Sequence, residues 1–473
     1  MISRTKFNIF SRSALIASIT LFLIVVKIIG QETRINDISI YGLTRTSKDI
    51  VIRDLFIQKG DRILIREIPE TIKENQWQLL NTGIYADVEI IPTLLKQDSS
   101  EISFIIYIQE AWFIYPTPYL EIVDRNFNVW WKDYKHDLSR INLGTKIFIN
   151  NLTGHRDRLD ILVHWGYHDK YEAEYSLPYI NKSNNLGIQL SGLWSNTKEL
   201  GYNTDNNNKQ ERFLSEHELL KRLKLGISLI YQPKIRSKQR LKIELRNYQI
   251  DSTIYSSLNK SFLYSTNNKL IYPVFSYDFQ FDRRNIKPHP TVGYAIYASI
   301  EKQGINSLRN ALLTVFELKN YLQIFPKITL AQNFRTQINW ITGIPDYYHN
   351  RALGEGDYYI RGYEYYLIDG QKYAYIKTSL QWLIHEGKWN LNKMMPIEAL
   401  KKPPIQIYFT LNNDLGYVAQ ARGFNKGQFN DKLIWGGGIG LEILAYYDKM
   451  IQLEYSFNQL FENDVFLHLN LNF

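Results

Sequence analysis

From about residue 112 to residue 473 the sequence alternates apolar and polar side chains in short segments, and this alternation limits the possible folds more than any other feature. Successive side chains of a β-strand point to opposite faces, so a period of two predicts strands with one apolar face. In the final segment every second residue from Val465 to Phe473 is apolar. Other alternating segments are residues 159–168, 275–282 and 405–412. No helical period is evident here, so this region is expected to be all-β.

Alternation alone is also typical of a soluble β-sandwich or propeller. Three features favour a membrane barrel: an export signal, an apolar face rich in aromatic residues, and a last strand that ends on the aromatic Phe473. About 360 residues at roughly 10 per strand, with unequal turns, predict about 16 strands. The expected fold class is therefore a mostly β protein, with a transmembrane antiparallel β-barrel over residues 112–473.

The N-terminus has the composition of a secretory signal peptide, predicted over residues 1–30. Arg4, Lys6 and Arg12 precede an uncharged apolar run over residues 14–26. The alternative is a membrane anchor, but the run is shorter than the ~20 residues that a spanning helix needs. A signal peptide is the favoured interpretation.

Charge and composition exclude several classes of protein. The formal net charge is +9, and the four basic residues of the signal leave +5 for the rest. The remaining Lys and Arg residues are scattered among acids, so no nucleic-acid partner is expected. Cysteine is absent, which excludes disulfides. The mean hydropathy of −0.30 excludes a helical protein with many spans, whereas the alternating strands of a barrel average out.

Residues 31–111 have a different pattern, which predicts a small α+β domain. The expected order is strand, helix, helix, strand, strand, over residues 35–42, 47–56, 64–81, 85–91 and 101–110. This order, together with Gly42-Leu-Thr-Arg-Thr46 and Leu80-Asn-Thr-Gly-Ile-Tyr85, resembles a polypeptide-transport-associated (POTRA) domain. The resemblance implies one periplasmic POTRA domain over residues 31–111, which binds client chains by adding a strand to its sheet edge.

The segment Leu353–Tyr363 lies between two strand-like segments and contains a distinctive arginine. Gly354 and Gly356 permit positive φ or close backbone approach. The stretch Ile360-Arg361-Gly362-Tyr363 then flanks one guanidinium with apolar, glycine and aromatic residues. The fork of donors on Arg361 suits a carboxylate partner, so the loop is expected to be held by an acid.

Alternation also indicates which acids face the interior of the barrel. Asp282, Asp414 and Glu442 fall on inward phases. A charge in a partly dry interior is costly unless it is paired. We expect Arg361 to pair with Asp414, with Glu442 as second acceptor, and Ile360 and Tyr363 to pack beside the pair. The alternative is that each acid merely lines a wet interior.

These motifs, taken in chain order, resemble the BamA/TamA superfamily of outer-membrane assembly factors, with a surface-antigen-type barrel. The resemblance is carried by Ile360-Arg-Gly-Tyr363, the Asp414 strand with Gly416, and the glycine-rich start before Glu442. The superfamily's strand–loop motif corresponds to Asp282, Arg283 and Gly293. Its C-terminal barrel signal corresponds to Phe466 and Phe473.

The resemblance implies an outer-membrane factor that inserts or exports client polypeptides through or beside its barrel, with its N-terminal domain in the periplasm. The implied partners are unfolded outer-membrane or exported proteins and outer-membrane lipid, with periplasmic chaperones or lipoproteins as further candidates. A dedicated single-partner exporter and a plugged outer-membrane pore are the alternatives.

No enzymatic chemistry is expected. The sequence lacks a Gly-x-Ser-x-Gly elbow and a His-Glu-x-x-His motif. The nine histidines are scattered without metal-ligand spacing, and Gly436-Gly-Gly-Ile-Gly440 is followed by no Lys-Ser/Thr. The sequence therefore predicts no catalytic residue, no metal site and no cofactor.

Overall fold

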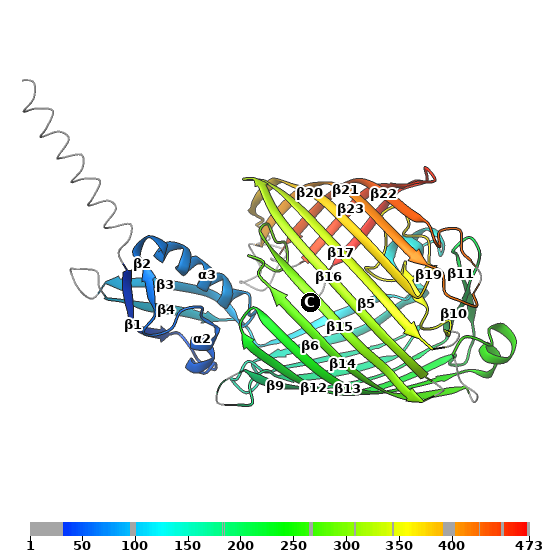
Figure 1. Ribbon diagram of the computed structural model, residues 1–473, viewed down its shortest axis with the longest axis horizontal. Helices are drawn as coiled ribbons and strands as arrows, with labels where there is room; N and C mark the ends of the chain where they lie inside the picture. The colour runs from blue at the N-terminus through cyan, green and yellow to red at the C-terminus, as the bar shows by residue number, and fades with distance from the viewer. Residues whose placement is uncertain are drawn as a thin grey trace, which may run out of the picture. The chain divides into compact units, whose positions relative to one another are not determined.

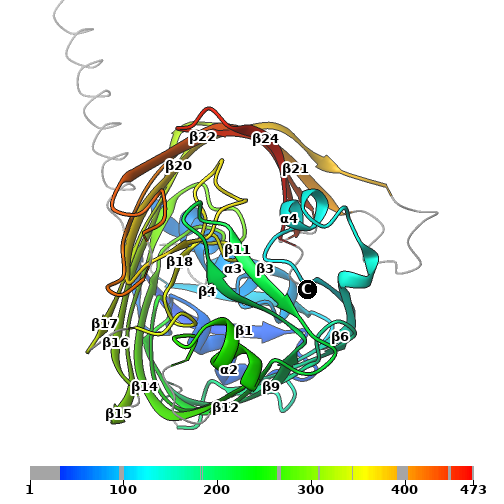
Figure 2. The same cartoon turned by 90° about the vertical axis from the view of Figure 1, so that its right-hand side faces the viewer.

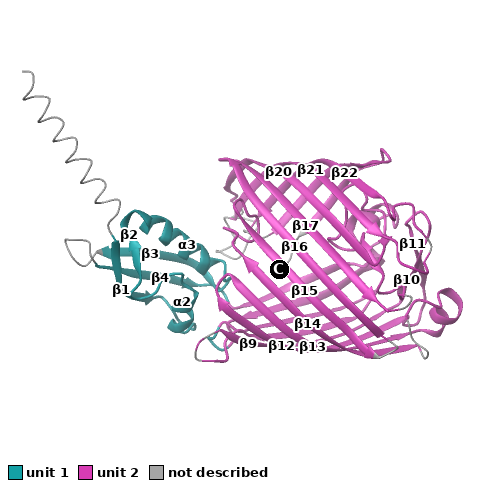
Figure 3. Cartoon of the chain, in the orientation of Figure 1, with its two compact units in different colours: residues 1–112, 153–155 teal, residues 113–152, 156–473 magenta. Residues whose placement is uncertain are grey.

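A computed structural model describes the chain as two compact units, residues 1–112 with 153–155 and residues 113–152 with 156–473 (Figure 3). The signal peptide expected over residues 1–30 lies outside the described residues. The described residues are 32–94, 101–181, 183, 185–263, 268–306, 309–342, 345–390, 403–424, 426–445 and 449–470.

The first unit is a four-stranded sheet with two helices, in the strand order β2-β1-β4-β3 (Figure 1). β1 and β4 are parallel, whereas β1–β2 and β3–β4 are antiparallel. Its core includes Val51 and Leu79 from the helices and Phe104 from the sheet. Two features were not predicted from sequence, the short edge strand β2 and a 3₁₀ turn, η1, that precedes the second helix. The elements are β1 (Glu32–Tyr41), α2 (Lys48–Asp54), β2 (Arg62–Leu64), η1 (Ile65–Glu67), α3 (Ile68–Leu80), β3 (Tyr85–Leu94) and β4 (Glu101–Glu110).

The second unit is a 16-stranded antiparallel sheet curled into a barrel (Figures 1 and 2), which confirms the predicted fold class. Neighbours in the sheet follow the chain, except where short elements intervene. The barrel strands are β5 (Ile114–Ile122), β6 (Ile141–Asn150), β7 (Arg158–Trp165), β8 (Lys170–Leu177), β9 (Leu186–Thr197), β12 (Leu220–Lys234), β13 (Ser237–Ile250), β14 (Lys269–Asp282), β15 (Gly293–Asn306), β16 (Arg309–Phe325), β17 (Ile328–Ile341), β20 (Lys372–Lys388), β21 (Pro404–Ala419), β22 (Leu433–Ala445), β23 (Lys449–Asn458) and β24 (Asn463–Asn470).

Several short elements lie between the barrel strands. One of them, α4, falls in a region where the sequence indicates no helix, because six residues are too few to establish a helical period. Among the described residues, no helix is both long enough and apolar enough to cross a membrane. The short elements are α4 (Phe127–Lys132), η2 (Leu138–Arg140), β10 (Glu199–Thr204), β11 (Gln210–Leu214), η3 (Ile254–Leu258), β18 (Arg351–Leu353) and β19 (Ile368–Asp369).

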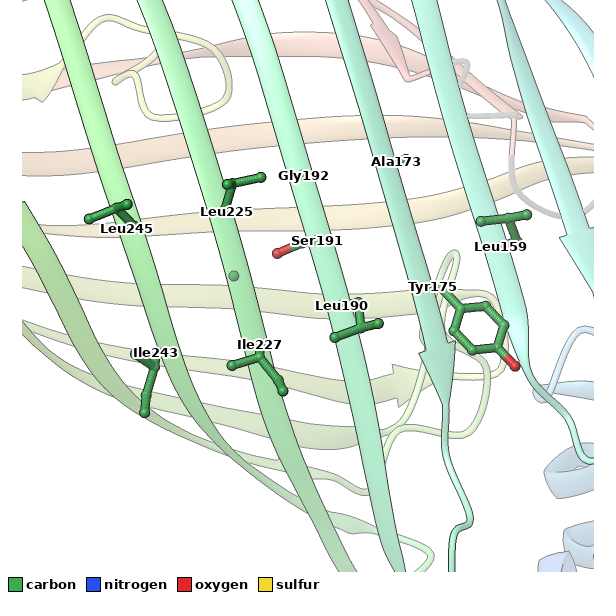
Figure 4. A pocket seen from close by; sticks show the side chains of 11 residues that line it. Leu159, Ala173, Tyr175, Leu190, Ser191, Gly192, Leu225, Ile227, Ile243 and Leu245 are labelled. Carbon is green, nitrogen blue, oxygen red and sulfur yellow. The ribbon is translucent and has the colours of Figure 1, made fainter.

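The two faces of the barrel wall differ as alternation predicts. On β12, Ile227 is 47% exposed and Leu229 42%, whereas Ser228 between them is 3% exposed. Figure 4 shows a shallow apolar depression on this wall, where Leu and Ile side chains surround Ala173 and Gly192. The outer face is thus apolar, and polar side chains point into the barrel.

The barrel sheet has two edge strands, β5 and β24. The strand order runs from β24 to β5, and among the described residues no backbone pairing joins them. We call this boundary the seam. Helix α4, in the connection between β5 and β6, contacts β24. Part of the seam is therefore covered by this helix.

Candidate functional site

The segment between β17 and β20, residues 345–371, folds inward and is here called the central loop. In Figure 2 the part around β18 lies within the outline of the barrel. The loop folds back on itself at Gly354, whose φ is +106° and where a Cβ would lie 2.1 Å from the carbonyl oxygen of Tyr366. Only glycine fits this close approach.

Arg361 is the polar centre of the central loop. Its Nη1 donates to Asp414 Oδ1 at 2.8 Å, and its Nε donates to Glu454 Oε1 at 2.9 Å. The Arg361 backbone N–H also donates to Asp414 Oδ2 at 3.2 Å. Arg361 is 8% exposed and both carboxylates are completely buried. We call these three residues the loop lock, because they tie the loop to strands β21 and β23.

Inward-facing polar side chains surround the loop lock and complete its hydrogen bonds. Asn412 Nδ2 donates to Glu454 Oε1 at 2.9 Å, and Gln452 Nε2 donates to the same oxygen at 2.6 Å. Ser379 lies within 3.4 Å of Arg361 Nη2. Charge-assisted bonds of this kind are roughly twice as strong as neutral ones. The lock is therefore a connected network, not an isolated ion pair.

Glycines allow the loop backbone to lie directly against β22 and β23. Gly362 has φ +81°, and a Cβ there would lie 2.6 Å from the backbone carbon of Phe457. At Gly436, which is opposite Asp414 in register, a Cβ would lie 1.8 Å from the carbonyl oxygen of Arg361. The glycine-rich start of β22 is thus the surface on which the arginine motif rests.

The apolar members of the motif pack into one cluster with the barrel wall. Ile360 is 1% exposed and Tyr363 2% exposed. The Tyr363 ring meets Phe429 edge-on, with centroids 5.0 Å apart, and its hydroxyl donates to the carbonyl of Trp435 at 3.2 Å. Apolar packing therefore supports the polar lock on both sides.

The expected role of Glu442 as second acceptor is wrong. Its Oε2 lies 3.0 Å from His289 Nε2, and Glu454 of β23 takes the place at Arg361 instead. The reason is height along the strand. Asp414 is opposite Gly436, and Glu442 lies six positions farther along β22. The side chain of Gln452 separates the two acids, since its Nε2 donates to Glu442 Oε1 at 3.1 Å and to Glu454 Oε1 at 2.6 Å. Glu454 falls on the inward phase of β23, but phase alone does not distinguish these two acids.

The strand–loop motif forms a separate local structure. Asp282 accepts from Arg284 Nη2 at 2.7 Å, and the Arg283 backbone N–H donates to the carbonyl of Tyr294 at 2.8 Å. Gly293 has φ +106°, and a Cβ there would lie 2.2 Å from the Arg283 carbonyl oxygen. These residues shape the turn between β14 and β15, and the structure does not bring them to Arg361.

Of the two residues assigned to the C-terminal barrel signal, the structure describes Phe466 only. Phe466 is 2% exposed, and its ring lies 5.3 Å from that of Tyr365 in the central loop, measured between centroids. Phe473 lies outside the described residues. The inward side of the last strand therefore packs against the central loop.

A 16-stranded barrel that holds an arginine loop against its last strands defines the structural class of this chain. Solved proteins are similar to it in overall fold. One is BamA from Haemophilus ducreyi lacking POTRA domains 1–3, with TM-score 0.50, 11% identity, and coverage of 92% of this chain and 83% of that chain. Another is CdiB from Escherichia coli, with TM-score 0.52, 12% identity, and coverage of 92% and 75% respectively. No family model and no curated protein sequence matches this chain. The chain shares the fold of these BamA and CdiB structures.

Proposed function

We propose that this protein is an outer-membrane barrel that inserts or exports client polypeptides. The observation that carries the proposal is the seam. Within the described residues, β5 and β24 are unpaired with one another, while the central loop is fixed to β21 and to β23, the strand next to β24. A barrel built only as a rigid shell gains nothing from leaving two strand edges unjoined.

The seam offers chemistry that a client strand needs. In a bilayer every backbone N–H and C=O must be hydrogen-bonded, and an unpaired edge supplies a ready partner. A client strand pairing with β24 or β5 would exchange backbone bonds without an unpaired state in the hydrocarbon. Neither a nucleotide nor a cofactor is required for such an exchange.

The first unit supports a role in client capture before the barrel is reached. β3 is an edge strand of its sheet, ten residues long, paired on one side by β4. Extended peptides add to such edges through main-chain hydrogen bonds, with little demand on sequence. We place this unit in the periplasm, because a domain that captures clients before they reach the barrel must lie on that side of the outer membrane.

The experiment is the folding rate of an unfolded outer-membrane protein in liposomes, with and without this protein. We expect acceleration, and we expect Arg361→Ala to reduce it. Arg240→Ala is the matched control, because Arg240 pairs with Asp278 inside the barrel at 2.7 Å but belongs to strands remote in the chain from the lock. No acceleration for several clients, with the barrel folded, would reject general insertion.

A second candidate, a dedicated exporter or a plugged pore, is favoured by what occupies the interior. The tip of the β10–β11 hairpin bonds to the central loop, since Leu367 N–H donates to the Asn208 carbonyl at 2.8 Å. Asn208 Nδ2 returns a bond to the Leu367 carbonyl at 3.2 Å. Loss of a dedicated exporter should abolish secretion of one partner and leave bulk outer-membrane proteins intact.

A further inference from the structure

Three potential metal ligands converge beside the loop lock. Glu364 comes from the central loop, Glu454 from β23 and His468 from β24, and one ligand atom of each lies within 4.8 Å of the other two. Because the three lie far apart in the sequence, no spacing motif could reveal them. The cluster shares Glu454 with the loop lock but does not include Arg361 or Asp414.

The ligand atoms are buried and lack hydrogen-bond partners. Glu364 is 1% exposed, and neither of its carboxylate oxygens has a hydrogen bond. Glu454 uses Oε1 in the loop lock, while its Oε2 is buried without a hydrogen bond. His468 Nε2 is buried and makes no hydrogen bond, and it approaches the two carboxylates only at ion-pair distances. Buried polar groups normally have partners, so four such atoms facing one another indicate a ligand that the protein does not supply.

The local charge also favours a cation. Three buried carboxylates, those of Glu364, Asp414 and Glu454, lie near two permanent cations, Arg361 and Lys377. The third basic group is the imidazole of His468, which carries a charge only when it is protonated. Elsewhere in the barrel buried acids are balanced, since Asp124 and Glu199 share the guanidiniums of Arg140 and Arg212. An uncompensated buried carboxylate is costly, and a bound cation would remove that cost.

The two separations that involve His468 are close to those between ligands of one metal ion. Ligands about 2.0–2.2 Å from Zn²⁺ at tetrahedral angles lie about 3.3–3.6 Å apart. His468 Nε2 lies 3.5 Å from Glu454 Oε2 and 3.7 Å from Glu364 Oε1. The imidazole is held by Tyr359, whose ring stacks on it at 4.8 Å with an interplanar angle of 12°. The histidine is thus already oriented toward both acids.

We propose that Glu364, Glu454 and His468 bind a divalent transition-metal ion, with Zn²⁺ as the expected occupant. One imidazole and two carboxylates are a suitable donor set, and the fourth position is available to water. The ion would clamp the central loop to the last two strands, one of which borders the seam. Metal binding at this site does not depend on whether the barrel handles clients.

The test is Zn²⁺ binding to the purified full-length barrel in detergent after chelation, measured by calorimetry and by metal content after dialysis. We expect one high-affinity ion per chain, with affinity lowered at least about tenfold in Glu364→Gln and in His468→Gln. His289→Gln is the matched control, because His289 is a buried histidine with a single carboxylate, Glu442, at 3.0 Å. That variant should bind Zn²⁺ normally.

A second readout separates binding at this site from misfolding of a variant. Co²⁺ bound by the wild-type barrel should give the visible absorption of a low-symmetry four-coordinate site, and Zn²⁺ should displace it. Zn²⁺ should also slow proteolysis of the central loop in the wild type but not in His468→Gln. Absence of stoichiometric binding in the folded wild type, or binding as tight as in the wild type in both ligand variants, would overturn the proposal.

Discussion

The side-chain amide of Asn128 in α4 takes the place of a neighbouring strand on the edge of β24. Its Oδ1 accepts from the Leu467 backbone N–H at 2.8 Å, and its Nδ2 donates to the Leu467 carbonyl at 3.3 Å. In an antiparallel pair, every second residue directs its backbone N–H and C=O away from the partner strand. Leu467 directs these two groups away from β23, and Asn128 binds both of them. Asn128 is 4% exposed, so water does not readily replace it.

The segment before α4 ties the same element to the central loop. Asn126 Nδ2 donates to the Glu364 carbonyl at 2.9 Å, and Arg125 donates to the carbonyls of Tyr365 and Gly354. Burial, and next the charge of Arg212, lower the pKa of Arg125 to about 10, so it remains cationic near neutral pH. Residues 125–132 therefore join the central loop to the seam strand, and we call them the seam latch.

Removing the Asn128 amide should expose the edge of β24. Asn128→Ala loses both bonds, each worth about 0.5–1.5 kcal/mol. We expect amide hydrogen exchange at Leu467 to accelerate by about 5- to 150-fold, which corresponds to that loss. Asn128→Asp keeps the acceptor but loses the donor and should lie between. Unchanged exchange at Leu467 in Asn128→Ala would show that the amide does not close the edge.

Fixing the seam latch should block any function that needs the seam to open. Lys132 Nζ and Asp464 Oδ2 are 2.7 Å apart, and both side chains are partly exposed. The chain has no cysteine, so Lys132→Cys with Asp464→Cys can be joined by a short reducible cross-linker without background reaction. We expect cross-linking to abolish acceleration of client folding and reduction to restore it. Either single-cysteine variant, treated identically, serves as control.

Substitutions of Arg361 should rank by how well they satisfy two buried acids. Arg361→Ala leaves Asp414 and Glu454 unpaired, a loss of about 3–5 kcal/mol for loop docking. Lys keeps the charge but not the fork, so Arg361→Lys should be milder, and Arg361→Glu should be the most disruptive. Hydrogen exchange over residues 345–371 measures the docking. Equal protection in Arg361→Glu and Arg361→Lys would contradict the pairing.

Sequence was sufficient for the fold and for part of the loop lock, because both depend on local signals. A period of two specifies which face of a strand each residue occupies, and this placed Asp414 inside the barrel. The glycines around Arg361 and at the start of β22 marked where two backbones approach. These signals can be read without knowledge of the tertiary structure.

The remainder depended on register and on distance along the strands. Glu442 and Glu454 share an inward phase, but only the offset between β21, β22 and β23 places Glu454 beside Arg361. The contacts of Asn128 with Leu467 join the first loop to the last strand, and no local pattern encodes such a meeting. The metal ligands were missed for the same reason.

The first unit should lose local stability in acid through Glu110. This carboxylate accepts backbone N–H bonds from Thr44 at 3.0 Å and Thr46 at 2.7 Å. Burial alone would raise the pKa of Glu110, but hydrogen bonds from Thr44 and Thr46 outweigh it and lower the pKa below its usual 4.5. The stability that the Glu110 carboxylate contributes is therefore fully present above pH 4.5 and is lost as the pH falls through the lowered pKa of Glu110.

Amide protection of residues 44–46, corrected for intrinsic exchange, measures this effect. We expect protection in the full-length protein to fall in acid, and we expect Glu110→Gln to be less protected near neutral pH and nearly independent of pH. Glu89→Gln, which alters an exposed side chain on β3, is the control. Identical pH profiles for wild type and Glu110→Gln would assign the acid sensitivity to another group.

Gly436→Ala should undock the central loop without altering charge. The added Cβ would lie 1.8 Å from the Arg361 carbonyl oxygen, which is backbone and cannot rotate away. Overpacking of this kind costs about 1–3 kcal/mol, and here the loop should yield because the β22 ladder is the more rigid partner. Proteolysis within residues 345–371 should accelerate by about 5- to 150-fold if cleavage follows the open population.

Gly192→Ala is the control, since its Cβ would meet nothing nearer than Leu225 Cδ2 at 3.7 Å. Equal cleavage rates in the two variants would show that the loop is not seated on Gly436.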